Sequence, residues 1–312
     1  MHKKITFDIV YLHYLSEMEK KWKITTLAGQ KLIIKKNIID FFKNIEINKI
    51  DQVLVNRWRQ SISKYSINYK NKLLIQLKAI IRTSNRVFFT TNNIVEGEPP
   101  FKDDTMIQEK KIYYTSEQFS SFQEEVDNVG MLALFTTLFY TGLRIGEIRA
   151  LKWTDISFED GYINVSKSVT NKAIKAKNDK SYLILTPKSK SSIRKVYYPF
   201  DELQPILIKH FEKAQRRIGF NTNWFVFGDD HPYSETNIRR QNIKYAKRAN
   251  LPAIRIHDYR HSYISMLYKL NVDVAVTKEQ AGHASIQTTM NIYTQLSEND
   301  KKNVIQKAFL KK

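Results

Sequence analysis

The stretch "EGEPP" divides the chain into two parts that cannot share one regular element. Gly97 favours a break, and Pro99 and Pro100 each lack the backbone N–H that a helix interior or an inner strand requires. Acidic residues also gather around this point, in "NIVEGEPPFKDDT". We therefore expect three parts: a first domain at residues 1–95, a linker at residues 96–111 and a second domain at residues 112–312.

The first part carries apolar residues at helical spacing, separated by lysines. The pattern occurs in "KLIIKKNIIDFFKNI", in "DQVLVNRWRQSI", where Asp51 is a good N-cap, and in "NYKNKLLIQLKAIIRTSNRVFF". Residues 1–100 hold 18 Lys+Arg and 8 Asp+Glu, so half of the formal net charge of +20 lies in this third of the chain. Such an excess predicts a polyanionic partner, most often nucleic acid. We interpret this part as a helical domain that grips DNA; an ordinary bundle with a solvated basic face is the alternative.

The second part mixes helices with short strands. Thr115 and Gln118 form a capping-box pattern at the start of a helix. "ISFEDGYINVS" predicts a hairpin that turns at Asp160 and Gly161, and "YLILTPKSKSSIRKVYYP" predicts a second strand pair around a basic tip. Further helices are expected at about 116–127, 131–150, 201–218, 235–249 and 258–270. The expected fold class is mainly α with a small antiparallel β-sheet (α+β).

Several classes of protein are excluded by composition and hydropathy. The chain has no cysteine, so disulfides, thiolate zinc sites and a cysteine nucleophile are impossible. The first twenty residues are interrupted by acids and histidine and form no signal peptide. No run of about 18 apolar residues occurs, so no membrane-spanning helix is expected. These features fit a protein of the reducing cytoplasm.

Arg144 is the first candidate for chemistry. It lies between Leu143 and Ile145 in "TGLRIGEIRALKW", just after Gly142, which is expected to break the preceding helix. A charge in apolar company has to be paired or has to meet an anion, because an isolated buried charge is costly. Glu147 follows three residues later on the same helical face, so an internal salt bridge is the alternative reading.

The stretch "IHDYRHSYISML" places two histidines around an arginine. If Asp258 caps a helix there, His257 and Arg260 lie one turn apart and face the same side, while His261 turns aside. A His-x-x-x-His pair can hold zinc, but Arg260 would repel the cation. Anion binding suits these residues better, and no metal is expected.

A third stretch, "EQAGHASIQTTMNIYTQL", has Gly282 as a helix C-cap, followed by His283 and a new helix that carries Tyr293. Taken together, "TGLRIGEIRALKW", "HDYRHSY" and this stretch, in this order and spacing, resemble the catalytic boxes of the tyrosine recombinases, the phage-type integrase family. The resemblance covers about residues 112–312. The first domain is similar, more loosely, to the family's core-binding helical domain.

The resemblance implies a role for each site residue. Arg144, Arg260, His257 and His283 would bind a scissile DNA phosphate, and Tyr293 would attack it to give a 3′-phosphotyrosine. Lys188 would protonate the leaving 5′-oxygen, with Lys190 as the fallback. Glu147 would orient an arginine, and His261 would support the site at most. No cofactor, metal ion or ATP is expected.

The resemblance also implies partners: double-stranded DNA with specific recombination sites, a homo-oligomer that forms a tetramer on paired sites, and accessory proteins that bend DNA or set directionality. The basic segment "NDKKNVIQKAFLKK" would dock on a neighbouring subunit or pack on its own domain. Two rival functions stay open: a type IB topoisomerase, and a DNA-binding regulator without catalysis. Many integrases carry a further N-terminal domain, and the sequence leaves open whether one precedes this chain.

Overall fold

The chain folds into two compact units, which are described separately below. A computed structural model describes residues 4–102, 112–171, 182–186 and 193–293, together with Lys302 and Gln306. Within that description, the first unit contains residues 4–102 and the second unit contains the remainder. None of the helices in these residues combines the length and the apolar character that crossing a bilayer demands.

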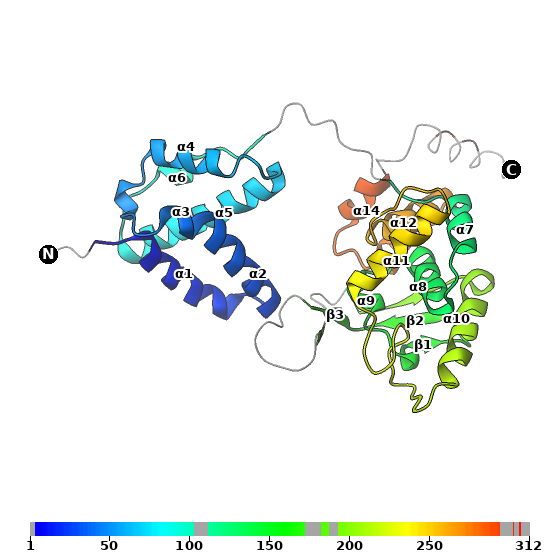
Figure 1. Ribbon diagram of the computed structural model, residues 1–312. Coiled ribbons are helices and arrows are strands. Elements are labelled where there is room, and N and C mark those ends of the chain that lie inside the picture. Colours follow the sequence, from blue (N-terminus) through cyan, green and yellow to red (C-terminus); the bar gives the residue numbers. More distant parts are fainter. Residues whose placement is uncertain are drawn as a thin grey trace. The chain divides into compact units, whose positions relative to one another are not determined.

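In residues 4–102 the elements of the first unit are helices and helical turns, beside one isolated β-bridge between Thr6 and Glu46 (Figure 1). Its elements are α1 (Phe7–Lys21), α2 (Ile24–Ile34), the π-helical turn η1 (Lys35–Ile39), α3 (Asp40–Phe42), the 3₁₀ turn η2 (Ile47–Lys49), α4 (Gln52–Ser61), α5 (Ile67–Phe88) and α6 (Ile94–Gly97). The π turn widens the helix, so the buried face passes from Ile34 to Ile38 and Phe42, whereas Leu32 is 70 % exposed. Asp51 caps α4 as expected, because its carboxylate accepts a hydrogen bond from the Leu54 backbone N–H.

The stretch after Gly97 packs against this first unit. The Glu98 carboxylate is 7 % exposed and accepts hydrogen bonds from Arg59 Nη1 (2.9 Å) and Gln52 Nε2 (2.6 Å). The Arg59 guanidinium also lies 3.9 Å from the centroid of the Phe101 ring. Residues 98–102, expected to begin a linker, therefore have fixed partners on α4.

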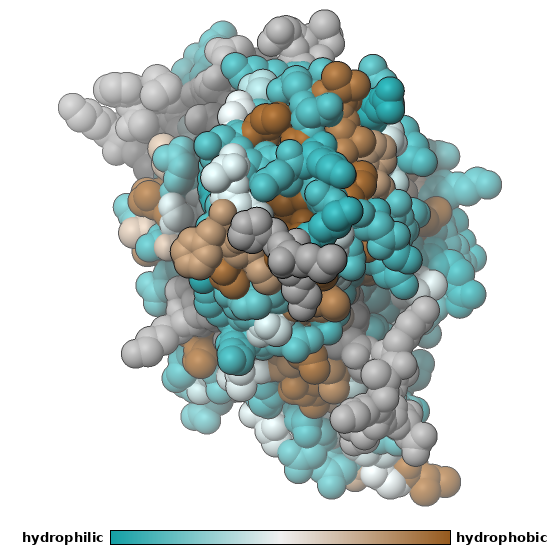
Figure 2. Space-filling view, turned by 90° about the vertical axis from the view of Figure 1, so that its left-hand side faces the viewer, coloured by the Kyte–Doolittle hydropathy of each residue, from teal (hydrophilic) through white to brown (hydrophobic). Residues whose placement is uncertain are grey.

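On the face shown in Figure 2, most of the coloured surface is hydrophilic, with separate apolar patches among the polar residues. One apolar hollow of about 540 Å³ lies on the first unit and includes exposed Leu12 and Leu32.

In the second unit, helices pack around two small antiparallel sheets. Its helices are α7 (Ser116–Glu124), α8 (Val129–Thr141), α9 (Ile145–Ile148), the 3₁₀ turn η3 (Trp153–Asp155), α10 (Phe200–Gln215), α11 (Glu235–Arg248), α12 (Asp258–Lys269), α13 (Val274–Ala281) and α14 (Ile286–Tyr293). Its strands are β1 (Ile156–Ser157), β2 (Tyr162–Val165), β3 (Ser168–Thr170), β4 (Leu183–Leu185) and β5 (Arg194–Tyr197). The expected mainly helical α+β fold is confirmed.

The strand pairing is partly as expected. β1 and β2 form the predicted hairpin, with Gly161 at a φ of 64° in its turn. The strand pair predicted within residues 182–198 is wrong: β4 pairs with β3, and β5 pairs with β2 to give the order β1-β2-β5. Alternation of buried and exposed residues identifies a strand, but it does not identify the partner, which is set by packing of the whole unit.

An aromatic core fixes α12, the helix that carries His257 at its N-cap. Tyr259 is fully buried and packs on Phe135, with ring centroids 5.7 Å apart. Its hydroxyl group donates a hydrogen bond to Asn242 Oδ1 (2.7 Å) on α11. Because Tyr259 is anchored in this way, its neighbour Arg260 has a defined direction.

Candidate active site

Arg144 is placed by the break between α8 and α9. α8 ends at Gly142, whose φ of 59° is left-handed, and a Cβ at this position would lie 2.5 Å from a ring carbon of Tyr263. Only glycine satisfies both the turn and the close approach. Arg144 follows as the N-cap of α9. The predicted single helix at 131–150 is therefore divided, as the glycine indicated.

Arg144 forms the salt bridge that its sequence context suggested. Arg144 Nη1 donates to Glu147 Oε1 (2.8 Å), and the Arg144 backbone N–H donates to Oε2 (3.0 Å). Arg144 Nη2 donates to the carbonyl oxygen of Gly282 (2.8 Å). The arginine side chain is nevertheless 37 % exposed, whereas that of Glu147 is 7 % exposed. Its guanidinium is thus held in place and is still open to solvent on one side.

Arg260 is the most deeply buried cation of the site, at 2 % exposure. Its Nη1 donates to the Gly142 carbonyl oxygen (2.8 Å), and its Nε donates to His283 Nε2 (3.2 Å). Its Nη2 has no hydrogen-bond partner among the described residues. Burial, followed by the nearby charge of Arg144, lowers the pKa of Arg260 to about 9. A buried donor without an acceptor costs about 1–3 kcal/mol, which an anion at this nitrogen would recover.

His283 follows Gly282, which ends α13 in the left-handed conformation (φ 66°), as predicted. Because His283 Nε2 accepts from Arg260, the ring proton belongs on Nδ1, which lies 2.8 Å from Thr289 Oγ1 on α14. Burial, then the charges of Arg260 and Arg144, lowers the pKa of His283 to about 3.

His257 is also held in its neutral form. Burial and the charge of Arg260 lower the pKa of His257. Asp258 is not the cap of α12, contrary to expectation: His257 occupies the N-cap position, and Asp258 lies in the first turn, where its carboxylate binds Arg255. His257, which would lie outside the helix if Asp258 were the cap, is therefore itself the half-helical capping residue.

A cleft of about 320 Å³ brings His257, Arg260 and His283 together, whereas Arg144 is not among its lining residues. It is lined by Arg255, His257, Arg260, His261, His283, Thr288, Asn291 and Ile292. The expectation that His261 turns aside is wrong. His257 and His261 are four residues apart and therefore share a helix face, with ring centroids 5.4 Å apart. Within the described residues, no three His, Cys, Asp or Glu side chains gather closely enough to hold a metal ion.

Tyr293 is the last residue of α14, the helix that supplies one wall of the cleft. Its side chain, like the whole of Lys188 and Lys190, lies outside the described residues. The role predicted for each of these three residues stays a prediction.

The sequence reading missed Arg194 on β5, the side chain of which is only 4 % exposed. Arg194 Nη2 lies 3.1 Å from Glu147 Oε2, so Glu147 is shared between two arginines. A signal existed, because arginine occupies a buried position in a strand that alternates buried and exposed residues. Arg144 and Arg194 share the buried carboxylate of Glu147, Arg260 adds a further cation, and the buried carboxylate of Asp258 is paired with Arg255, so cations outnumber carboxylates and the site is electropositive.

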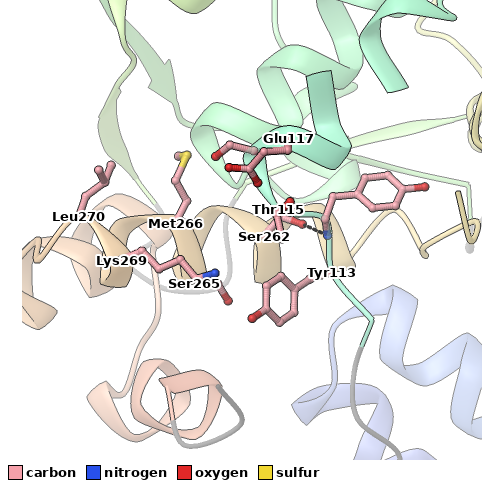
Figure 3. A pocket seen from close by; sticks show the side chains of 10 residues that line it. Tyr113, Thr115, Glu117, Ser262, Ser265, Met266, Lys269 and Leu270 are labelled. Carbon is pink, nitrogen blue, oxygen red and sulfur yellow. Dashed lines mark hydrogen bonds between the residues drawn. The ribbon is translucent and has the colours of Figure 1, made fainter. Parts of the chain in front are cut away.

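The start of the second unit, just before α7, holds α12 in place. Ser262 Oγ accepts a hydrogen bond from the Tyr114 backbone N–H (3.0 Å) beside a small pocket of about 120 Å³ (Figure 3). This pocket shares no lining residue with the cleft.

The chain is similar to phage integrases, both to their family models and to individual proteins. Residues 108–300 match the model of the phage integrase family, and residues 6–63 match that of the N-terminal SAM-like domain of phage integrases. The ICEBs1 integrase of Bacillus subtilis (strain 168) is 29 % identical over 317 aligned residues, covering 98 % of this chain and 83 % of that protein. The integrase of Staphylococcus phage L54a is 23 % identical over 328 aligned residues, covering 98 % and 93 %.

Solved structures share the fold over nearly the whole chain. The Tn1549 transposon integrase in complex with transposon right end DNA has a TM-score of 0.76 at 20 % identity, covering 97 % of this chain and 99 % of that one. A lambda integrase dimer bound to a COC′ core site has a TM-score of 0.69 at 15 % identity, covering 94 % and 97 %. A lambda integrase tetramer bound to a Holliday junction has a TM-score of 0.68 at 15 % identity, covering 93 % and 78 %.

Proposed function

The chain belongs to the phage integrase family, and from that premise we propose that the cleft around Arg260 binds the DNA phosphate at which strands are cut and rejoined. The resemblance seen in the three sequence boxes is thereby confirmed, and the protein is a tyrosine-type site-specific DNA recombinase of the mobile-element integrase kind. One observation carries the proposal: Arg260 Nη2 is a buried cationic donor without an acceptor among the described residues. The other nitrogens of the same guanidinium bind the Gly142 carbonyl oxygen and His283.

The arginines suit the transition state of phosphoryl transfer. Negative charge on the nonbridging oxygens would be met by Arg260 Nη2 and by the exposed side of Arg144 through charge-assisted hydrogen bonds. These groups are fixed before DNA arrives, because Arg144 is held by Glu147 and Gly282, and Arg260 is held by Gly142 and His283. Preorganised donors in a buried site stabilise developing charge without reorganisation.

In the proposed step, the Tyr293 oxygen forms a bond to phosphorus and the bond from phosphorus to the 5′-oxygen breaks. The phenolic proton passes to a neutral imidazole, for which His257 is suited because its lowered pKa leaves it unprotonated at neutral pH. Lys188 supplies the proton to the leaving 5′-oxygen, with Lys190 as the alternative donor. One phosphodiester replaces another, so no nucleotide cofactor is required.

For assembly, we propose that two or more subunits act on paired recombination sites, as a tetramer during strand exchange. The lambda integrase structures, a dimer on a core site and a tetramer on a Holliday junction, support this proposal. Residues 1–95 would grip DNA beside the catalytic domain at residues 112–312, with residues 96–111 as the connection. Half of the net charge of +20 lies in the first hundred residues, which favours phosphate contacts there. The expected setting is cytoplasmic, nucleoid DNA, with accessory proteins that bend DNA or set directionality.

Covalent trapping tests the proposed chemistry. A site DNA nicked close to the cleavage position loses its short 5′-fragment after attack, so the covalent complex accumulates. In EDTA, we expect wild-type protein joined to the 3′ phosphate through Tyr293, identified by mass spectrometry of the DNA-linked peptide. Tyr293→Phe should bind the same DNA and form no adduct. An adduct at another residue would refute the assignment, and a wild type that never forms one would favour the DNA-binding regulator. Relaxation of any plasmid by monomers would favour a topoisomerase.

A further inference from the structure

The pair Arg144–Glu147 does not stand alone. Glu147 Oε2 also lies 3.1 Å from Arg194 Nη2, and Glu147 Oε1 lies 3.4 Å from Arg194 Nη1. Glu147 comes from α9 and Arg194 comes from β5, so this contact joins the sheet to the helix that follows Arg144. Although burial raises the pKa of Glu147, the guanidiniums of Arg194 and then Arg144 lower it overall, so the carboxylate stays ionised.

Arg194 reaches a second support of Arg144. Its Nε donates to the carbonyl oxygen of Gln280 (2.8 Å) in the last turn of α13. Its guanidinium also lies against Gly282: a Cβ on that glycine would be 2.7 Å from the guanidinium carbon. Gly282 carries the carbonyl oxygen that accepts from Arg144 Nη2. Arg194 therefore binds the Glu147 carboxylate and packs against Gly282, the two residues that fix Arg144.

Arg194 itself is closed to solvent. Neither Arg194 nor Arg144 is among the described residues that line the cleft, but the Arg194 side chain is 4 % exposed, whereas the Arg144 side chain is 37 % exposed. The effect of Arg194 on a bound phosphate must therefore pass through other groups. The effect has a charge component as well as a geometric one. Glu147 paired with Arg144 alone would be neutral overall, whereas the three groups together carry one net positive charge in a buried setting, where charge acts strongly.

We propose that Arg194 is a positioning residue for Arg144, acting through Glu147 and the Gln280–Gly282 turn to keep the phosphate-binding guanidinium fixed and the trio net positive. The proposal rests on the function proposed above, because Arg144 must face the scissile phosphate for its position to affect the rate. This role differs from that of a purely structural salt bridge, because it predicts that loss of Arg194 lowers the cleavage rate while DNA affinity is retained.

The test measures single-turnover cleavage on a nicked site DNA and, separately, affinity for the intact site with Arg194→Met. Loss of a group that orients a metal ligand typically costs about 10- to 100-fold in activity, and we expect a cleavage loss of the same order from loss of a group that orients Arg144. Arg194→Lys keeps the charge but cannot bind Glu147 and Gln280 together, so its rate should lie between those of Met and wild type. Affinity should stay near the wild-type value in both. The matched control is Lys195→Met, the exposed neighbour on β5, which should cleave normally.

A double-mutant cycle with Glu147→Gln separates action through Glu147 from other roles. If Arg194 acts through Glu147, Arg194→Met should add little to the loss already caused by Glu147→Gln. The double variant also lacks an uncompensated buried carboxylate, so it remains informative if Arg194→Met alone fails to fold.

Additive losses, a parallel fall in affinity, or full-speed cleavage by Arg194→Met would each overturn the positioning role. A wild type that forms no covalent complex would instead overturn the proposed function, and this inference with it.

Discussion

Arg260→Lys is the substitution for which the structure gives the clearest expectation. Arg260 uses Nη1 for the Gly142 carbonyl oxygen and Nε for His283 Nε2, which leaves Nη2 for the phosphate. Lysine carries its three N–H donors on a single nitrogen, so it cannot reach acceptors that are spaced to meet three separate nitrogens of a guanidinium. If the lysine binds the phosphate, the Gly142 carbonyl oxygen and His283 Nε2 lose their donor. If the lysine binds either of these acceptors, the phosphate loses a donor. Losing a single preorganised oxyanion donor costs about 10²–10³ in rate, so we expect a cleavage loss of at least about 10².

The assay is single-turnover formation of the covalent complex on nicked site DNA, with affinity measured by fluorescence anisotropy at the same salt concentration. Affinity should change little, because many phosphate contacts share the binding energy, whereas the transition state depends on this donor. Arg217→Lys is the matched control, since Arg217 is exposed and pairs with Asp229. Equal losses of affinity and rate, or a lysine variant that cleaves like wild type, would refute the role given to Nη2.

Three further predictions follow from the same geometry and chemistry. Lys188→Ala should cleave a substrate with a 5′-bridging phosphorothiolate at nearly the wild-type rate, because this leaving group needs no proton; rescue of Lys190→Ala instead would transfer the role. Gly142→Ala should lower the unfolding free energy by about 1–3 kcal/mol from its left-handed backbone alone, measured by urea denaturation, whereas Gly29→Ala, with nothing within 4 Å of the new Cβ, should not destabilise the fold. The pKa of His283 is lowered to about 3, so between pH 6.5 and 3 this histidine is protonated in the unfolded chain but not in the folded chain, and the unfolding free energy should fall as the pH drops through that range. His283→Asn should flatten this pH dependence of the unfolding free energy, and an unchanged slope would contradict the shift.

Local signals in the sequence predicted the features that depend on local chemistry. The capping box at Thr115 and Gln118 forms, and Gly142 and Gly282 end their helices in the left-handed conformation. Each of these follows from a backbone or side-chain preference within a few residues. The Arg144–Glu147 salt bridge, predicted as one of two alternatives for Arg144, also depends on local spacing, since the two residues share a helical turn.

Features that depend on distant partners were missed or misread. The pairing of β4 with β3 and of β5 with β2 is set by packing across the second unit. Arg194 looked like one charge in a basic tract because its partners, Glu147 and Gln280, lie 47 and 86 positions away. The position of His261 was wrongly predicted for a different reason: Asp258 was expected as the cap, whereas His257 is the capping residue and shares a helix face with His261.

The most direct test of the central claim is a crystal structure of Tyr293→Phe bound to its own recombination site. The account predicts that the scissile phosphate lies in the cleft, with a nonbridging oxygen within hydrogen-bonding distance of Arg260 Nη2 and another near Arg144. A scissile phosphate bound elsewhere, with Arg260 Nη2 still without an acceptor, would contradict it.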